Sequence, residues 1–216
     1  MNGSEIDKIK RLLSDKRKIV IIPHKNPDGD AIGSSMALKY YLDNFNHIVD
    51  IISPNQFPEF LKWMDPHNII KIFDEDEKYA QKIIDAQLIF TLDFNNLVRI
   101  ASMKQHVEKS TAQIIMIDHH EEPSDYADFM YSEPNMSSTC EMIYHFIDKM
   151  GDSNKIDKNI SRSLYAGIMT DTGSFKFPST TELTHQVISN LLKTYLHMSP
   201  TEFVVPVAHT KSSDSV

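Results

Sequence analysis

Three observations predict an α/β fold with a doubly wound, mainly parallel sheet of about five strands, flanked by helices and followed by a helical C-terminal part. Short strand-like runs alternate with helical patterns up to residue 117 of the 216-residue chain. The first run, Ile19 to Ile22, is β-branched throughout, which suits a strand buried on both faces. Beyond residue 117, helical patterns dominate.

The predicted elements follow in order along the chain. Apolar residues at helical spacing predict a helix over 5–13, and the strand at 19–22 is followed by a helix over 31–42. We expect further strands at 47–52, 68–73, 87–92 and 113–117, with helices at 59–63, 77–85 and 97–108 between them. The C-terminal part is predicted to hold an edge strand at 129–131 and helices at 138–150, 158–169 and 181–195.

The composition is that of a globular chain. It is 41% hydrophobic and 24% charged, which excludes a disordered or collagen-like protein. The 22 basic and 30 acidic side chains give a net charge of −8, which argues against broad capture of nucleic acid by a basic face. A small phosphorylated substrate held by bound metal stays compatible with this charge.

The sequence also predicts a compartment. Cys140 is the single cysteine, so no internal disulfide can form. The first residues carry charges where a signal peptide needs an apolar core, and no apolar run approaches the roughly 18 residues of a membrane span. We therefore expect a cytoplasmic protein without a membrane partner.

Polar clusters follow three of the predicted strands and one predicted helix. Ligands of open parallel sheets bind beyond the carboxyl ends of the strands, so we expect these clusters to meet in one crevice. Repulsion among their carboxylates would be costly unless cations neutralise it. The clusters contain His24, Asn26, Asp28 and Asp30, then Asp93, then Asp118, His119 and His120, and finally Asp171.

Most clusters have a plainer interpretation when taken alone. His24 suits a hydrogen-bonded loop histidine, Asp93 a helix cap and Asp171 a turn residue. An EF-hand starting at Asp28 fails because Lys39 stands where the bidentate Glu is needed, and no dinucleotide-binding GxGxxG follows the first strand. The three adjacent ionisable residues at 118–120 are not easily explained by folding.

The residue types indicate a reaction class. Carboxylate and imidazole donors without thiolate suit Mn²⁺ or Mg²⁺ better than a structural zinc. The donors outnumber what one catalytic ion would use, whereas two ions sharing a bridging carboxylate would use them all. Such a pair activates a hydroxide and clamps the oxygens of a phosphoryl group, so we predict phosphoester hydrolysis.

The same motifs carry a resemblance to a known family. In order, HKNPDGDAIGS, TLDFNN, MIDHH and GIMTDTGSF resemble the motifs of the DHH phosphoesterase superfamily, over nearly all of residues 18–190. Within it, the chain is most similar to the branch of oligoribonucleases and adenosine 3′,5′-bisphosphate phosphatases, or nanoRNases. That branch combines NPDGDAIGS with a later SST, matched here by residues 137–139.

The resemblance implies a ligand set for two divalent ions, with Mn²⁺ expected and Mg²⁺ as the alternative. One ion would be held by His24, Asp28 and Asp93, and a second by Asp30, Asp93, His119 and Asp171, so that Asp93 bridges. The resemblance also implies catalytic roles for two neighbours. Asp118 would orient ligand imidazoles, and His120 would face the scissile phosphate.

Substrate contacts are expected from four further residues. The expectation rests on hydroxyls placed where a helix N-terminus would aim free N–H groups at an anion. A helix cap by Ser137 or Ser138, with Glu141 completing a capping box from Ser138, is an equally good interpretation. The expected contacts are Asn26, Ser137, Ser138 and Thr139.

The domain expectation is a catalytic domain over residues 1–195, with 196–216 as the start of a linker or a frayed tail. Members of the resembling branch carry a second, substrate-binding domain with a glycine-rich motif, and nothing in this sequence corresponds to it. We therefore expect either a truncated chain or one that has shed this domain.

The expected function is Mn²⁺-dependent hydrolysis of short single-stranded RNA or of 3′-phosphoadenosine 5′-phosphate by a two-metal-activated hydroxide. A family II-like pyrophosphatase is disfavoured, because Gly29 replaces the Thr usual in the first motif of that family. A metal-binding but catalytically weak module, acting as a partner or dimerisation domain, is the alternative from another class. A homodimer is left open.

Overall fold

The computed structural model describes residues 1–75 and 78–196, and within these ranges it has one parallel sheet. The strand order is β3-β2-β1-β4-β5-β6, and every neighbouring pair runs parallel. The described part therefore has six strands, one more than expected. The strands are β1 (Lys18–Pro23), β2 (Ile48–Ser53), β3 (Lys71–Ile72), β4 (Leu88–Leu92), β5 (Gln113–Asp118) and β6 (Phe129–Ser132).

The extra strand is the expected edge strand. β6 pairs with β5 over four residues, with Ile117 opposite Tyr131. β3 is shorter than the expected strand at 68–73, because Asn68 has a positive φ of 51° and a 3-10 turn starts at Phe73. Both differences are at the edges of the sheet, where a strand has a neighbour on one side only.

The helices lie close to their expected positions. A 3-10 helix replaces the expected helix at 59–63, and another covers the first half of the expected helix at 97–108. In that second segment Ala101 has φ 50° and ψ −128°, which no α-helix accommodates. The helical segments are α1 (Gly3–Leu12), α2 (Gly29–Asp43), η1 (Glu59–Met64), η2 (Phe73–Glu75), α3 (Lys78–Ile84), η3 (Leu97–Met103), α4 (Lys104–Lys109), α5 (Thr139–Lys149), η4 (Ser153–Lys155), α6 (Lys158–Asp171) and α7 (Glu182–Leu196).

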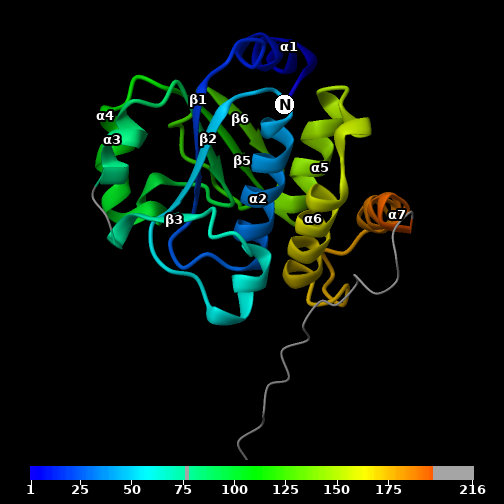
Figure 1. Ribbon diagram of the computed structural model, residues 1–216. Coiled ribbons are helices and arrows are strands. Elements are labelled where there is room, and N and C mark those ends of the chain that lie inside the picture. The colour runs from blue at the N-terminus through cyan, green and yellow to red at the C-terminus, as the bar shows by residue number, and fades with distance from the viewer. Residues whose placement is uncertain (76–77, 197–216) are drawn as a thin grey trace, which may run out of the picture.

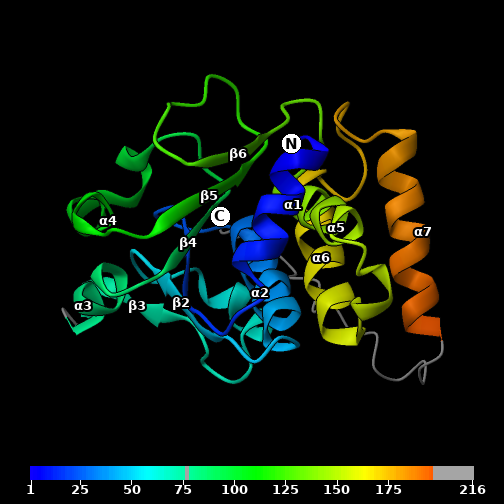
Figure 2. The same ribbon diagram turned by 90° about the horizontal axis from the view of Figure 1, so that it is seen from above.

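Helices cover both faces of the sheet, as Figures 1 and 2 show. α3 and α4 lie on one side, and α2, α5, α6 and α7 lie on the other. Successive side chains of β1 alternate between two apolar cores: Ile19 and Ile21 join the core under α2 and α5, while Val20 and Ile22 join the core under α3 and α4. The doubly wound α/β fold is thereby confirmed.

The strand order locates the crevice of the fold. β1 lies between β2 and β4, so the chain moves outward in one direction to β3 and then returns to continue on the other side of β1. At such a reversal the connections leave β1 and β4 toward opposite faces and open a gap beyond their carboxyl ends. Residues from both halves of the sheet therefore line this gap.

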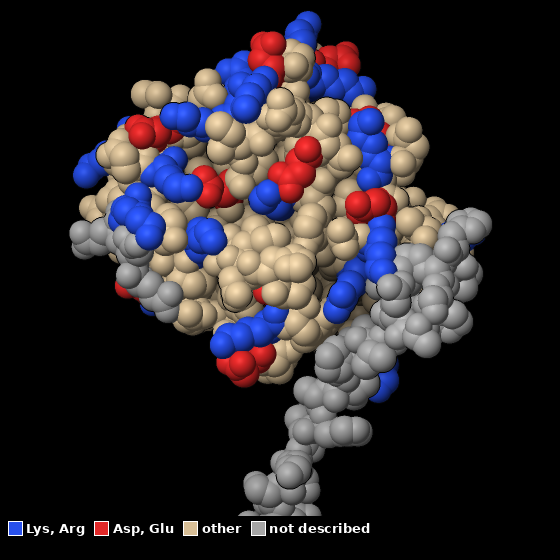
Figure 3. Space-filling view, in the orientation of Figure 1, with Lys and Arg blue, Asp and Glu red and all other residues tan. Residues whose placement is uncertain are grey.

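The surface carries mixed charge. On the face shown in Figure 3, Lys and Arg side chains are interspersed with Asp and Glu side chains, and no uniformly acidic field covers this face despite the net charge of −8. Within the described residues, no helix has the length and apolar character needed to cross a bilayer. The expected linker or tail falls almost entirely on residues 197–216, outside the described residues.

Candidate metal centre

The first polar cluster begins directly after β1. His24 is buried, and its Nδ1 donates to the Lys25 carbonyl oxygen at 2.8 Å. Because a carbonyl can only accept, Nδ1 carries the proton in the neutral ring, and in that form Nε2 keeps its lone pair. Nε2 lies 3.5 Å from Oδ2 of Asp93 and 3.9 Å from Oδ2 of Asp28.

The start of α2 supplies two carboxylates with different surroundings. Asp28 is the N-cap, and its Oδ1 accepts from the N–H groups of Asp30 and Ala31 at 3.0 and 3.1 Å. Asp30 is buried, and its two oxygens accept from the N–H groups of Thr139 and Cys140 at 2.6 and 2.9 Å. The carboxylate of Asp30 therefore occupies the N-terminus of α5, where the helix dipole favours a negative charge.

Asp93 follows β4 in a left-handed backbone conformation, with φ 66°. This conformation is costly for a residue other than glycine and occurs preferentially at functional sites. The N–H of Asp93 donates to the Ile117 carbonyl at 3.1 Å, and its Oδ1 accepts from the Thr139 hydroxyl at 2.9 Å. These contacts from β5 and α5 fix a buried carboxylate in the middle of the crevice.

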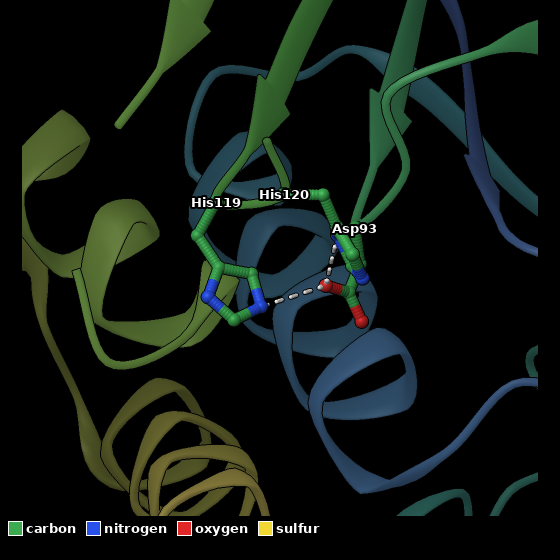
Figure 4. Close-up of side chains that lie close together, drawn as sticks. All are labelled: Asp93, His119 and His120. Atoms are coloured by element: carbon green, nitrogen blue, oxygen red, sulfur yellow. Dashed lines mark ion pairs between the residues drawn. The ribbon is translucent and has the colours of Figure 1, made fainter. Parts of the chain in front are cut away.

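The end of β5 directs two histidines to that carboxylate. As Figure 4 shows, the rings of His119 and His120 converge on one oxygen of Asp93, with nitrogen–oxygen distances of 3.6 and 3.9 Å. Nδ1 of His120 also lies 2.6 Å from Oδ1 of the fully buried Asp118. Nε2 of His119 lies 3.5 Å from Oδ2 of Asp171, the last residue of α6.

The electrostatics of the cluster follow from burial and like charges. Burial, together with the charges of Asp93 and Asp171, holds the pKa of Asp30 well above its usual range. Burial also raises the pKa of Asp171 to about 6, although the charge of His119 opposes this. For Asp93, burial would raise the pKa, but His24 and the two histidines after β5 outweigh it and lower the pKa.

The donor set fits divalent cations. Three groups of donors have atoms within 4.8 Å of one another, and the gaps of 3.5 to 3.9 Å exceed those of charge-assisted hydrogen bonds. Ligands about 2.1 Å from a shared ion are roughly 3.0 to 3.4 Å apart, which is closer to the observed spacing. The groups are His24, Asp28 and Asp93; Asp30, His119 and Asp171; and Asp93, His119 and His120.

The expected substrate residues at the start of α5 have buried hydroxyls that contact other protein groups. Ser137 donates to the Glu141 carboxylate, Ser138 caps α5 by accepting from the Glu141 N–H at 3.1 Å, and Thr139 contacts Asp93. The helix cap is present. The capping box is not, because the Glu141 carboxylate accepts from the N–H of Ser137 at 3.2 Å and not from that of Ser138. Direct contact of these residues with substrate stays a prediction.

Asn26 lies at the exposed rim and also stays a predicted contact. Its N–H donates to Oδ1 of Asn55 at 2.7 Å, and its own Oδ1 accepts from Nδ2 of Asn55 at 2.8 Å. Asn55 was not predicted, because a residue 29 positions away from Asn26 gives no local signal. The contact of the Thr139 hydroxyl with Asp93 was not predicted either, because it joins residues 46 positions apart.

The sequence of this chain is similar to those of known proteins. Residues 18–168 match the family model described as DHH family, N-terminal domain. The chain is 31% identical over 176 residues to a probable bifunctional oligoribonuclease and PAP phosphatase of Streptococcus mutans, covering 81% of this chain and 52% of that protein. It is 29% identical over 187 residues to the bifunctional oligoribonuclease and PAP phosphatase of Bacillus subtilis, covering 85% and 55%.

A solved structure extends the comparison to the fold. The crystal structure of an exopolyphosphatase-related protein from Bacteroides fragilis superimposes with a TM-score of 0.87 and 40% sequence identity. The match covers 90% of this chain and 57% of that chain. The chain thus spans about half the length of the curated relatives it matches.

Proposed function

Because the chain belongs to the DHH family, we propose that it is a metal-dependent phosphoesterase acting on short single-stranded oligoribonucleotides and on 3′-phosphoadenosine 5′-phosphate. The names of two relatives at about 30% identity support this substrate class. The observation that carries the proposal is the position of Asp93, whose carboxylate belongs to two donor groups in the crevice where the strand order reverses.

Two divalent cations, preferably Mn²⁺, are the proposed cofactors. One would be held by His24, Asp28 and Asp93, and the other by Asp30, Asp93, His119 and Asp171. When bound, such ions supply Lewis-acid chemistry that polarises the phosphoryl oxygens and lowers the pKa of water.

His120 is the proposed contact with the scissile phosphate. Its Nδ1 donates to Asp118, which fixes the ring and leaves Nε2 for the substrate. The hydrogen bond to Asp118 raises the pKa of His120 above its usual value of 6.5, although partial burial opposes this. A protonated Nε2 can donate to a phosphoryl oxygen or pass its proton to the leaving oxygen.

The test is hydrolysis by the purified chain, stripped of metal and then supplied with Mn²⁺. Labelled di- and trinucleotides should release mononucleotides, and 3′-phosphoadenosine 5′-phosphate should release phosphate. Asp93→Ala should abolish both reactions. The matched control is Asp50→Ala, because Asp50 is a strand carboxylate that pairs with Lys82 at 2.7 Å away from the crevice, and this variant should keep full activity.

Other outcomes would redirect the proposal. Turnover of pyrophosphate alone would favour the pyrophosphatase alternative, and tight Mn²⁺ binding without turnover of any phosphoester would favour a metal-binding module. Equal activity of Asp93→Ala and the unchanged chain would overturn the proposed site.

A further inference from the structure

Glu141 is a buried carboxylate in the first turn of α5 that belongs to none of the donor groups in the crevice. The residue is 1% exposed. Its Oε2 accepts from the N–H of Ser137 at 3.2 Å, from the Ser137 hydroxyl, and from the Thr184 hydroxyl at 3.0 Å. Burying a carboxylate is costly unless it is hydrogen-bonded, and here three donors converge on one of its oxygens.

The other oxygen of Glu141 has no hydrogen-bond partner within the described chain. Oε1 is buried and lies 4.0 Å from Nε2 of His145, one helical turn later, which is also buried and unpartnered. Burial lowers the pKa of His145, so its ring is neutral near pH 7 and does not form an ion pair. Within the described chain, Glu141 therefore makes its hydrogen bonds through Oε2.

The surroundings of Glu141 connect α7 to the metal centre. Thr184 lies in the first turn of α7, and Ser137 lies just before α5. The next residues hold two candidate ligands: the Thr139 hydroxyl donates to Asp93, and the N–H groups of Thr139 and Cys140 donate to Asp30. The first turn of α5 thus contacts ligands from two other elements, and Glu141 fixes that turn against α7.

We propose that Glu141 is a positioning residue that holds the first turn of α5 against α7 and so keeps Asp30 and Asp93 in place for divalent cations. The inference rests on the proposed function only in taking these two residues as metal ligands. The task needs one acceptor oxygen that can take several donors, and Oε2 of Glu141 accepts from the Ser137 N–H and from the Ser137 and Thr184 hydroxyls.

The test measures Mn²⁺ affinity of the metal-free chain by calorimetry, beside its melting temperature without metal. Glu141→Leu removes all three acceptor contacts and should weaken Mn²⁺ binding about 10-fold or more, as loss of groups that orient metal ligands commonly does. Thr184→Val removes only the contact from α7 and should weaken binding by a smaller factor. Glu141→Gln keeps one acceptor oxygen and should restore most of the affinity.

A matched control separates positioning from stability. Asp157 caps α6 by accepting from the Ile160 N–H at 2.9 Å, at the end of that helix far from Asp171. Asp157→Ala should lower the melting temperature without changing Mn²⁺ affinity. Unchanged Mn²⁺ affinity in folded Glu141→Leu would overturn the proposal, as would an equal loss of affinity in Asp157→Ala at a similar loss of stability.

The variants also separate this inference from the proposed function. If the unchanged chain binds Mn²⁺ but hydrolyses no phosphoester, the proposed function fails while the affinities still decide the role of Glu141. If Glu141→Leu does not fold, Thr184→Val decides: weaker Mn²⁺ binding supports the proposal, and unchanged binding overturns it.

Discussion

Polar side chains have different partners at the two ends of the parallel strands, which are called the amino edge and the carboxyl edge of the sheet. At the amino edge, Nδ1 of the buried His47 accepts from the Arg17 N–H at 3.2 Å, and Oε1 of Gln87 accepts from the Lys18 N–H at 2.9 Å. At the carboxyl edge, three aspartates are buried within or beside a cluster of histidines: Asp30, Asp93 and Asp118.

This difference in partners shows which polar residues stabilise the fold. Amino-edge side chains satisfy backbone N–H groups at the ends of strands, so they stabilise the sheet without needing a ligand. Carboxyl-edge side chains place carboxylates close to one another, which costs stability in the absence of cations. Proteins accept such a cost where function requires it.

The same substitution at both edges should have very different effects on activity. His24→Asn removes a candidate metal ligand at the carboxyl edge, and we expect kcat/KM for a dinucleotide with Mn²⁺ to fall about 100-fold or more. His47→Asn at the amino edge keeps an acceptor for the Arg17 N–H and should leave kcat/KM unchanged. A similar loss of kcat/KM in both variants would contradict this difference between the two edges.

A carboxylate of the crevice should be unfavourable for stability when no metal is present. Asp171 has its pKa raised to about 6, mainly by burial, against 3.8 for the unperturbed group. Its native state therefore holds a proton more tightly, and stability is lost as the pH rises through 6.

Asp171→Asn should accordingly raise the free energy of unfolding at pH 7.5 by about 1 kcal/mol in the presence of a chelator. The gain should vanish at about pH 3, where the wild-type carboxyl is mostly protonated in both states. Urea denaturation at the two pH values measures it. A variant that is less stable than the wild type at pH 7.5 would show that Asp171 supports the fold.

The free energy of unfolding should also depend on pH through His47 at the amino edge, by a smaller amount than through Asp171. Burial and the charge of Arg17 lower the pKa of His47 below 6.5, so the unfolded chain binds a proton there more readily than the native one. The stability contributed by neutral His47 is present above pH 6.5 and is lost as the pH falls below it. His47→Asn does not titrate, so its free energy of unfolding should fall less than that of the wild type between pH 7.5 and 5.5. Equal slopes in urea denaturation would contradict this.

Local patterns predicted most elements because burial imposes those patterns on the chain. The β-branched run at β1 predicted a strand buried on both faces, and both cores use it. The prediction of a helix over 97–108 was partly wrong, because Ala101 has a positive φ of 50°. Alanine rarely adopts such a conformation, so its presence in the sequence gives no sign of it. The count of about five strands was low by one, because it did not include the edge strand expected at 129–131, which pairs with β5 as β6.

The chemistry of the candidate site could be predicted from local sequence, because histidines and aspartates follow strands of a parallel sheet and the carboxyl ends of these strands share one edge. The hydrogen bonds that hold these groups in place could not be predicted in this way, because they join residues far apart in the chain. Asp30 meets the N–H of Thr139 across 109 positions, and Asp93 meets the hydroxyl of the same residue across 46. Such contacts depend on the strand order and on how α5 packs against α2, whereas local periodicity reports only which residues are buried.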